Sequence, residues 1–100
     1  MSQKQPAKLS VEEIGRRLLA LGQGWAVQAQ QLEKSYPFPN FREALAFTNQ
    51  IGQIAESMNH HPDIFLAWGL VRLSITTHSA GGLTENDFAL AAKIDETSLH

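Results

Sequence analysis

Apolar and polar positions along this chain follow two different periods, and the changes of period divide it into seven regular elements. Apolar side chains recur every three or four residues in three segments, which we predict as helices: 10–21, 40–58 and 84–94. They alternate with a period of two in four segments, which we predict as strands: 25–30, 32–38, 63–68 and 70–77. The predicted order is therefore helix, strand, strand, helix, strand, strand, helix.

Each predicted helix starts at a residue whose side chain can cap it. A polar capping residue is followed three positions later by an acidic one in three pairs: Ser10 with Glu13, Asn40 with Glu43, and Thr84 with Asp87. In such a capping box the two side chains satisfy backbone N–H groups that the first turn leaves unpaired. Pro62 cannot continue a helix, so the second helix has to end before it.

The pairing of consecutive strands predicts an α+β fold. Strands that follow one another with short connections form antiparallel hairpins, and helices with one apolar stripe pack on one face of a sheet. A chain of 100 residues is the size of one domain. We predict a disordered N-terminal tail over residues 1–8, which are polar and show no periodicity, and a single domain over residues 9–100.

Composition excludes several classes of function. The net charge is −2 with scattered basic residues, so nucleic-acid binding is not expected. No apolar run approaches the roughly 20 residues that span a bilayer, and the first residues lack the apolar core of a signal peptide. The chain has no cysteine, which excludes disulfides, thiolate catalysis and cysteine-ligated metals. We expect a soluble protein of the cytoplasm without a membrane partner.

Three of the four histidines lie between Glu56 and His78, and this stretch carries the candidate chemistry. Histidine exchanges protons near neutral pH, which suits it to acid–base catalysis. His60 and His61 follow the second helix, and His78 ends the last strand. Glu56 precedes His60 by four residues on the same helical face, so it either orients that imidazole or is a solvated helix residue.

Other roles compete for the same residues. Zinc favours histidine, but needs three or four converging ligands, and adjacent side chains of an extended segment point to opposite faces. We therefore expect no metal at His60 and His61. Trp68 is suited to a core or interface first and to stacking on a planar ligand second. Asp87 is already explained by its helix cap.

One spacing pattern resembles a known family. It consists of Glu56, His60-His61-Pro62, Trp68, His78 and Asp87, and is similar to the signature of the pterin-4a-carbinolamine dehydratases. The segments Thr76-Thr77-His78-Ser79 and 80–84 agree as well. The pattern covers the C-terminal half directly, and the order of elements extends the resemblance to nearly the whole chain after residue 8.

The resemblance implies a fold, an assembly and an activity. The fold is a four-stranded antiparallel sheet with three helices packed on one face, in a homodimer or homotetramer. The activity is removal of water from 4a-hydroxytetrahydropterin to give quinonoid dihydropterin, in support of tetrahydrobiopterin recycling, without a metal or organic cofactor. Where some relatives carry aspartate before the histidine pair, this chain has Asn59, which can still hydrogen-bond a pterin edge.

The site that the resemblance implies has three groups of residues. The catalytic group comprises His60, His61 and His78. Seven residues are assigned to the pterin substrate: Glu56, Asn59, Pro62, Trp68, Thr76, Thr77 and Ser79. Asp87 supports the site. We predict that His61 and His78 form the acid–base pair, and that His60, oriented by Glu56, completes the pocket.

Two other functions fit the same residues. Some animal relatives also bind a dimeric transcription factor, so a non-catalytic interaction or coactivator role is one alternative, with the exposed face of the second helix as its surface. The other is a dehydratase-like protein that acts in molybdopterin metabolism. The histidines would be identical in that case, so the sequence leaves the physiological pterin open.

Overall fold

The chain forms one sheet with its helices on one side, in the predicted order. The computed structural model describes residues 6–97. Its elements in chain order are α1 (Val11–Ala20), β1 (Ala26–Gln28), β2 (Gln31–Pro37), α2 (Phe41–Met58), β3 (Asp63–Ala67), β4 (Leu70–Ile75), a 3-10 turn η1 (His78–Ala80) and α3 (Glu85–Thr97). Much of the tail predicted as disordered lies outside the described residues, and that part stays a prediction.

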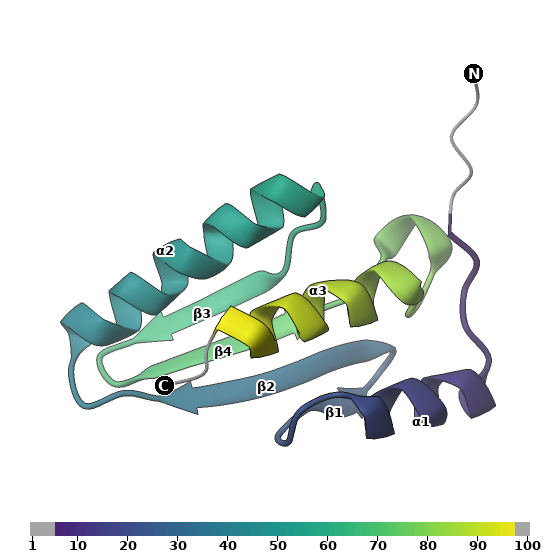
Figure 1. Ribbon diagram of the computed structural model, residues 1–100, viewed down its shortest axis with the longest axis horizontal. Helices are drawn as coiled ribbons and strands as arrows, with labels where there is room; N and C mark the ends of the chain where they lie inside the picture. The colour runs from purple at the N-terminus through teal and green to yellow at the C-terminus, as the bar shows by residue number, and fades with distance from the viewer. Residues whose placement is uncertain (1–5, 98–100) are drawn as a thin grey trace.

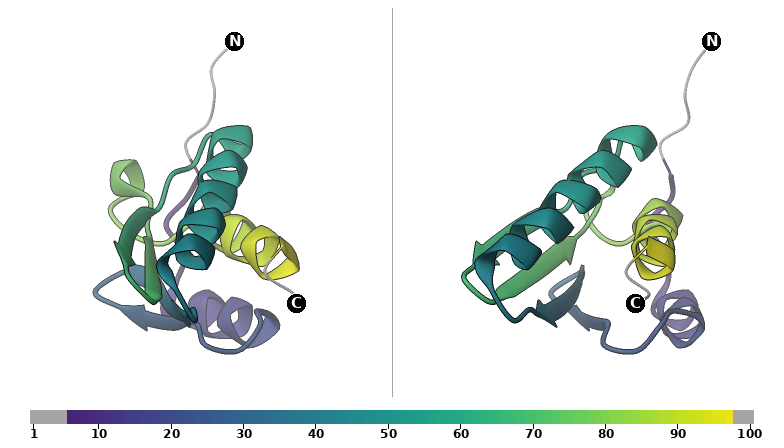
Figure 2. Two further views of the ribbon diagram at one scale, coloured as in Figure 1. Left: turned by 90° about the vertical axis from the view of Figure 1, so that its left-hand side faces the viewer. Right: turned by 60° about the vertical axis from the view of Figure 1, so that its left-hand side comes forward.

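The four strands form an antiparallel sheet in the order β1-β2-β4-β3. The two hairpins meet in the middle, where β2 pairs with β4 from Leu32 opposite Ile75 to Pro37 opposite Leu70. Figures 1 and 2 show α1, α2 and α3 on the same side of the sheet. The predicted α+β architecture is therefore confirmed. No helix among the described residues is long and apolar enough to cross a membrane.

The core lies between the sheet and the helices. Alternate residues of the central strands point into it from the sheet side. Leu32 and Tyr36 of β2 point into it, as do Val71, Leu73 and Ile75 of β4, all of them buried. The helices cover this face of the sheet with residues at helical spacing: Ile14 from α1, Ala44, Phe47, Ile51 and Ala55 from α2, and Phe88, Leu90, Ala91 and Ile94 from α3.

Lys34 is the one charged residue at a core-facing position of β2. Its Nζ lies 3.2 Å from Oδ1 of Asp95 on α3, and 5.6 Å and 5.0 Å from the ring centroids of Trp25 and Tyr36. Asp95 also accepts hydrogen bonds from Nε1 of Trp25 at 3.0 Å and from the backbone N–H of Gly22 at 2.9 Å. The lysine is compatible with the core because an anion and two aromatic faces surround it.

The three predicted helix caps are present. The side chains of Ser10 and Asn40 accept hydrogen bonds from the N–H groups three residues later, at 3.2 Å and 3.0 Å. At α3 both residues of the pair take part: Oγ1 of Thr84 accepts from the N–H of Asn86 at 3.2 Å, and Oδ2 of Asp87 accepts from the N–H of Thr84 at 2.8 Å. These caps explain why the predicted starts of the helices agree with the observed ones.

Some details predicted from the periodicity of apolar residues are wrong. Ala29 and Gln30 form the β1–β2 turn with φ of 49° and 63°, the left-handed backbone at both positions that is typical of a type I′ hairpin turn. The sequence offers no glycine or asparagine there to indicate it. The apolar spacing of the predicted helices 10–21 and 84–94 also includes Val11 and Ala92, but both are exposed. In α3 the buried stripe passes through Leu90, Ala91 and Ile94 instead.

Candidate active site

The end of α2 determines how the two adjacent histidines are presented. Asn59 takes the left-handed conformation (φ 52°, ψ 41°), and the N–H of His60 reaches back to the carbonyl of Ala55 at 3.1 Å. This is a Schellman-type helix end, which satisfies carbonyls of the last turn and turns the chain away from the helix axis. His60 and His61 therefore lie beyond the helix, in the extended segment that Pro62 continues into β3.

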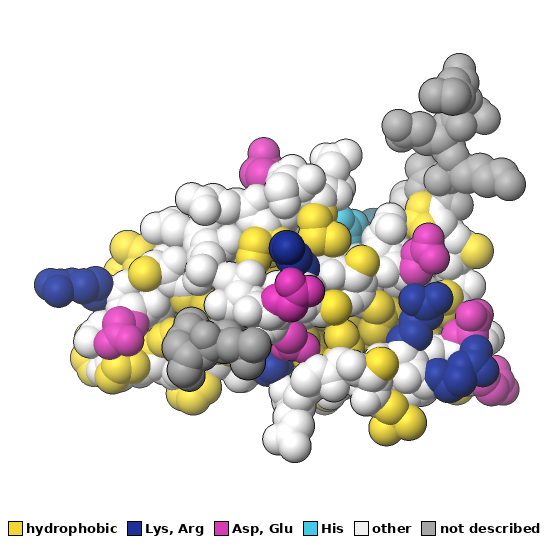
Figure 3. Space-filling model, in the orientation of Figure 1, with side chains coloured by type: hydrophobic (Ala, Val, Ile, Leu, Met, Phe, Trp, Pro, Cys, Tyr) yellow, Lys and Arg dark blue, Asp and Glu magenta, His cyan; other side chains and the backbone are white. Residues whose placement is uncertain are grey.

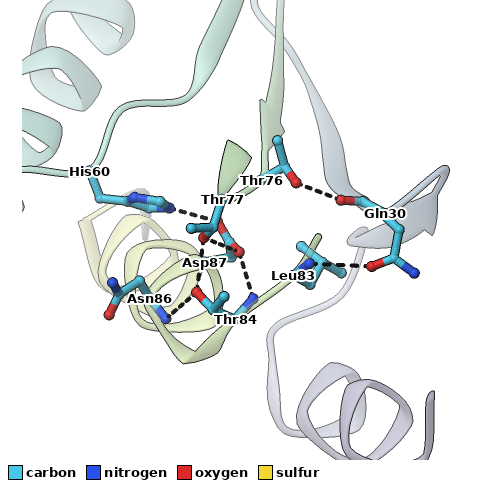
Figure 4. Close-up of polar contacts among 8 residues, drawn as sticks. All are labelled: Gln30, His60, Thr76, Thr77, Leu83, Thr84, Asn86 and Asp87. Atoms are coloured by element: carbon cyan, nitrogen blue, oxygen red, sulfur yellow. Dashed lines mark hydrogen bonds and ion pairs between the residues drawn. The ribbon is translucent and has the colours of Figure 1, made fainter. Parts of the chain in front are cut away.

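His60 is paired with Asp87 of α3. Its Nε2 lies 2.6 Å from Oδ1 of Asp87, and the exposed fractions of the two side chains are 15% and 0%. Figure 4 shows the imidazole pointing from the end of α2 towards the start of α3. The helix cap that accounts for Asp87 in the sequence thus uses only one of its two carboxylate oxygens.

The other contacts of Asp87 determine the direction of a short chain of hydroxyl groups. Its Oδ2 accepts from Oγ1 of Thr77 and from the N–H of Thr84, both at 2.8 Å. Since Thr77 has a single hydroxyl hydrogen, its 2.9 Å contact with Oγ1 of Thr84 requires Thr84 to be the donor. Oγ1 of Thr84 in turn accepts from the N–H of Asn86 at 3.2 Å. Every polar atom of this buried chain therefore has a partner.

The same count of donors and acceptors places a hydrogen on one nitrogen of His60. A carboxylate accepts hydrogen bonds and donates none, so the hydrogen between His60 and Asp87 belongs to Nε2. The second ring nitrogen, Nδ1, is then the atom through which His60 can accept or donate a proton elsewhere. A buried carboxylate that orients an imidazole through one nitrogen in this way is typical of acid–base sites.

Glu56 pairs with His61, and the predicted contact with His60 is wrong. Oε2 of Glu56 contacts Nε2 of His61, and the two side chains are 78% and 53% exposed. The prediction assumed that His60 continues the helical face of Glu56. The left-handed turn at Asn59 breaks that face and brings the next residue, His61, over the last turn of α2. Each histidine of the pair thus has its own carboxylate, one buried and one exposed.

The loop after β4 carries His78 next to this cluster. Thr77, whose hydroxyl joins Asp87, directly precedes His78, the first residue of η1. The loop is closed by a bridge between Thr77 and Gly82, with N···O distances of 3.3 Å and 3.4 Å in the two directions. The side chain of His78 is exposed. Its backbone therefore lies one residue from the Asp87 network, while its convergence on the other two histidines stays a prediction.

The remaining predicted substrate residues fall in three places. Asn59 and Pro62 flank the histidine pair, and Thr76 donates a hydrogen bond to the carbonyl of Gln30 at 2.7 Å. Ser79 lies in η1, in the loop of His78. Trp68 lies beyond the far end of β3, about 17 Å along the strand from Asp63, and is 68% exposed. The structure therefore does not bring Trp68 to the histidines of the same chain.

Two residues of the network were not predicted as part of the site. Thr84 was assigned only to the helix cap, and its hydroxyl adds a contact with Thr77. Gln30 lies in the β1–β2 turn and reaches Leu83 with its side chain and Thr76 with its carbonyl (Figure 4). The pairing of Thr84 with Asp87 could have suggested the first. No sequence signal indicates the second, since it depends on how two loops meet.

Two other kinds of site, a cavity elsewhere in the fold and a metal centre, compete with the histidines. A cavity of about 420 Å³ lies between α1 and α3, lined by residues that include Arg17, Leu21 and Phe88 and by no histidine. Figure 3 shows hydrophobic side chains in the furrow between these helices. Within residues 6–97, no three His, Asp or Glu side chains are grouped to hold a metal ion. The candidate site is therefore the histidine–carboxylate cluster.

Known proteins match this chain over most of its length. A family model described as "Pterin 4 alpha carbinolamine dehydratase" matches residues 7–97. Proteins of Alkaliphilus metalliredigens and Roseiflexus sp., whose names place them among the pterin-4-alpha-carbinolamine dehydratases, are each 47% identical over 89 residues. These matches cover 88% and 89% of this chain, and 80% and 95% of the two relatives.

A solved structure matches the fold as well. The crystal structure of a "transcriptional coactivator/pterin dehydratase" from Brucella melitensis superposes with a TM-score of 0.86 at 32% identity. The match covers 92% of this chain and 99% of that one. The arrangement of sheet and helices described above is therefore shared with a protein of known structure.

Proposed function

Because the chain belongs to the pterin-4-alpha-carbinolamine dehydratase family, we propose that it removes water from a 4a-hydroxytetrahydropterin and releases a quinonoid dihydropterin. The observation that supports this most directly is the pair of adjacent histidines, each bound by its own carboxylate, beside the loop of His78. Such a set supplies acid and base groups and no nucleophile. Dehydration needs only the former.

The reaction requires two proton transfers. An acid protonates the 4a-hydroxyl group, the C4a–O bond breaks and water leaves. A base takes the proton from N5, and the electron pair of the N5–H bond forms the N5=C4a double bond. Positioned groups that exchange protons near neutral pH each contribute typically about 10²–10⁴-fold to such a step. Histidine is the side chain best suited to both transfers.

The contacts of the three histidines suggest how they share this work. His61 and His78 have exposed side chains, which leaves them accessible to a substrate, and we assign them the acid–base pair. His60 is held by the buried carboxylate of Asp87, so it has a fixed orientation and presents Nδ1. Glu56 acts on His61, where it can orient the ring during proton transfer.

Separate replacement of His61 and His78 by alanine tests the proposal. We expect each variant to dehydrate 4a-hydroxytetrahydropterin about 10²–10⁴-fold more slowly than wild type. His100→Ala, at the last residue of the chain, is the matched control and should keep the wild-type rate. Rates unchanged in both variants would end the assignment. The wild-type rate should also be the same with and without a chelator, and a rate abolished by the chelator would overturn the metal-free mechanism.

We assign the product to tetrahydrobiopterin recycling, with molybdopterin metabolism as the alternative. The same acid–base groups serve either pterin, so a substrate panel has to decide between them. A dehydration rate at least tenfold higher for the biopterin substrate than for other 4a-hydroxytetrahydropterins would favour recycling. A cytoplasmic location stays a prediction from the sequence.

We propose a homodimer or homotetramer as the working assembly. Two apolar regions support it: Phe65 and Trp68 on and beside the edge strand β3, 48% and 68% exposed, and Phe41 and Leu45 on α2, 43% and 40% exposed. Sedimentation should give a mass of two or four chains, reduced by Phe41→Ser with Leu45→Ser if α2 forms a contact. A monomer at micromolar concentration would contradict the assembly.

A protein-interaction role is the second candidate function. The name of the Brucella melitensis structure includes a coactivator, and the exposed apolar residues of α2 are a surface on which another chain could bind. Loss of all three site histidines should leave this interaction intact while abolishing dehydration. A partner whose binding instead depends on the histidines would argue that any binding follows from catalysis.

A further inference from the structure

Gln30 connects the β1–β2 turn to both ends of the loop that carries His78. Its backbone carbonyl accepts from Oγ1 of Thr76 at 2.7 Å, at the end of β4. Its side-chain Oε1 accepts from the N–H of Leu83 at 3.3 Å, where the same loop returns towards α3. Figure 4 shows both contacts, with Gln30 facing Thr76 and Leu83 from the β1–β2 turn. One residue thus bonds to the loop on either side of His78.

The packing around Gly82 supports the same contact. A Cβ atom added at Gly82 would lie 2.4 Å from Oε1 of Gln30, so the amide occupies the space that a side chain there would fill. The flexible end of Lys8 is the other close neighbour, at 2.8 Å. Gly82 is buried and bridges Thr77 across the base of the loop. A side chain at this position would therefore force the Gln30 amide to shift.

The backbone of the turn fixes the point from which the Gln30 side chain extends. Ala29 and Gln30 both have left-handed φ, and Gln28 pairs with Gln31 on either side of them. A two-residue turn of this kind has little freedom, because the ladder on both sides fixes its geometry. Gln30 therefore extends from a rigid hairpin onto a loop that is otherwise held by the Thr77–Gly82 bridge and the start of α3.

The residues that Gln30 contacts are the immediate neighbours of the Asp87 network. Thr76 precedes Thr77, and Leu83 precedes Thr84. The hydroxyl groups of Thr77 and Thr84 are hydrogen-bonded at 2.9 Å, and that of Thr77 donates to Asp87. Asp87 holds His60. A shift of the loop would move His78 directly and His60 through this chain of hydrogen bonds. Displacement of about 1 Å can cost about 10²-fold in rate where orientation matters.

We propose that Gln30 is a positioning residue for the dehydratase site, which makes the β1–β2 turn part of its machinery although no residue of the turn carries acid–base chemistry. The role rests on the proposed dehydratase function. It places the loop of His78 and, through Thr77 and Thr84, the Asp87–His60 pair. The expected consequence is that loss of the Gln30 amide lowers kcat more than it raises KM.

Gln30→Met tests the proposal, because methionine has a similar length and lacks the carbonyl oxygen. We expect kcat to fall about tenfold, with KM changed less than threefold, and the amide of Leu83 to exchange its hydrogen faster. Gln30→Glu keeps an acceptor oxygen and should recover kcat to within about threefold of wild type. Gln28→Met, the same substitution at an exposed position of β1, is the matched control and should behave as wild type.

Gly82→Ala provides a second route if Gln30→Met does not fold. The added methyl group displaces the Gln30 amide, so kcat should fall in a similar way. In the background of Gln30→Ala the same change should cost little more, because then only the flexible end of the Lys8 side chain has to move. Additive losses would overturn the proposal, as would a wild-type kcat in Gln30→Met or no recovery in Gln30→Glu.

The ring signals of His60 and His78 in NMR spectra separate this proposal from the proposed function. Both should shift in Gln30→Met and stay unchanged in Gln28→Met, whether or not a pterin is turned over. A wild-type chain without dehydratase activity would refute the proposed function, yet these shifts would still show the positioning. Unshifted rings in an active enzyme would refute the role of Gln30 alone.

Discussion

The Nε2 atom of His60 lies 2.6 Å from Oδ1 of Asp87, although 27 residues separate them in the chain. The same carboxylate caps α3 and accepts a hydrogen bond from the hydroxyl group of Thr77. One fully buried side chain therefore joins the end of α2, the end of β4 and the start of α3. The three segments that carry the candidate site thus meet at a single charge. This arrangement couples the stability of the fold to the geometry of the site.

Asp87→Asn should reduce both stability and activity. The amide keeps the shape, but it cannot accept all three hydrogen bonds, and it leaves a buried group unpaired. We expect a loss of about 1–3 kcal/mol in the free energy of unfolding, measured in urea, and a kcat at least tenfold lower. Glu85→Gln, an acid-to-amide change on the exposed side of the same helix turn, is the control and should stay within about 0.5 kcal/mol. Equal stability of the two variants would contradict the central role of Asp87.

Asp95→Asn should destabilise the opposite end of α3 without affecting catalysis. Asp95 accepts from Trp25 and Gly22 and pairs with Lys34, and its side chain is 19% exposed. Removal of its charge leaves the lysine without an anion in the core, at a cost of about 1–3 kcal/mol. Glu96→Gln is the matched control, since Glu96 is 72% exposed. A stability equal to that control would show that the Lys34 pair contributes nothing.

Tyr36→Phe should remove a loss of stability that wild type shows in alkaline solution. Burial of the hydroxyl, and secondarily the negative charge of Asp95, raise the pKa of Tyr36 well above its ordinary value of 10. The folded chain then keeps the phenol proton to higher pH than the unfolded chain, so stability is complete below pH 10 and is lost as the pH rises beyond it. The phenylalanine variant has no phenol to ionise, so it should not lose this part of its stability at high pH.

Two further measurements check the tyrosine. The hydroxyl of Tyr36 is buried and has no hydrogen-bond partner among the described residues. At pH 7 the phenylalanine variant should therefore be as stable as wild type, within about 0.5 kcal/mol, or more stable. Tyr36 is the only tyrosine in the chain, so its titration can be followed by absorbance near 295 nm. Ionisation of the folded protein at pH 10 would refute the shift.

Two glycines should respond to alanine in opposite directions. Gly52 lies inside α2 with no atom within 4 Å of an added Cβ, so Gly52→Ala should stabilise the fold by about 0.5–1 kcal/mol. A Cβ at Gly69 would lie 2.9 Å from the backbone oxygen of Phe38, and Gly69→Ala should cost about 1–3 kcal/mol. Thermal unfolding of both variants measures the difference. A destabilised Gly52→Ala would mean that the outer face of α2 is covered by another chain.

The order of elements, the helix starts and the fold class could be predicted from the sequence because each depends on local chemistry. Alternation along β2 and β4 places Leu32, Leu73 and Ile75 in the core, and the side chains of Ser10, Asn40 and Asp87 cap the helices over three residues. The histidines, Glu56 and Asp87 of the candidate site were also named from the sequence, through the resemblance of their spacing to a known family, whereas Thr84 and Gln30 were not.

The partners of those residues were decided by tertiary structure alone. Glu56 was expected to pair with His60, but one left-handed residue at Asn59 transfers it to His61 and leaves His60 to Asp87. Trp68 is at the far end of β3, and Gln30 reaches the loop of His78 from another hairpin. Periodicity says which face of an element a residue occupies. It cannot say which element lies opposite, because that depends on how the helix ends and turns pack together.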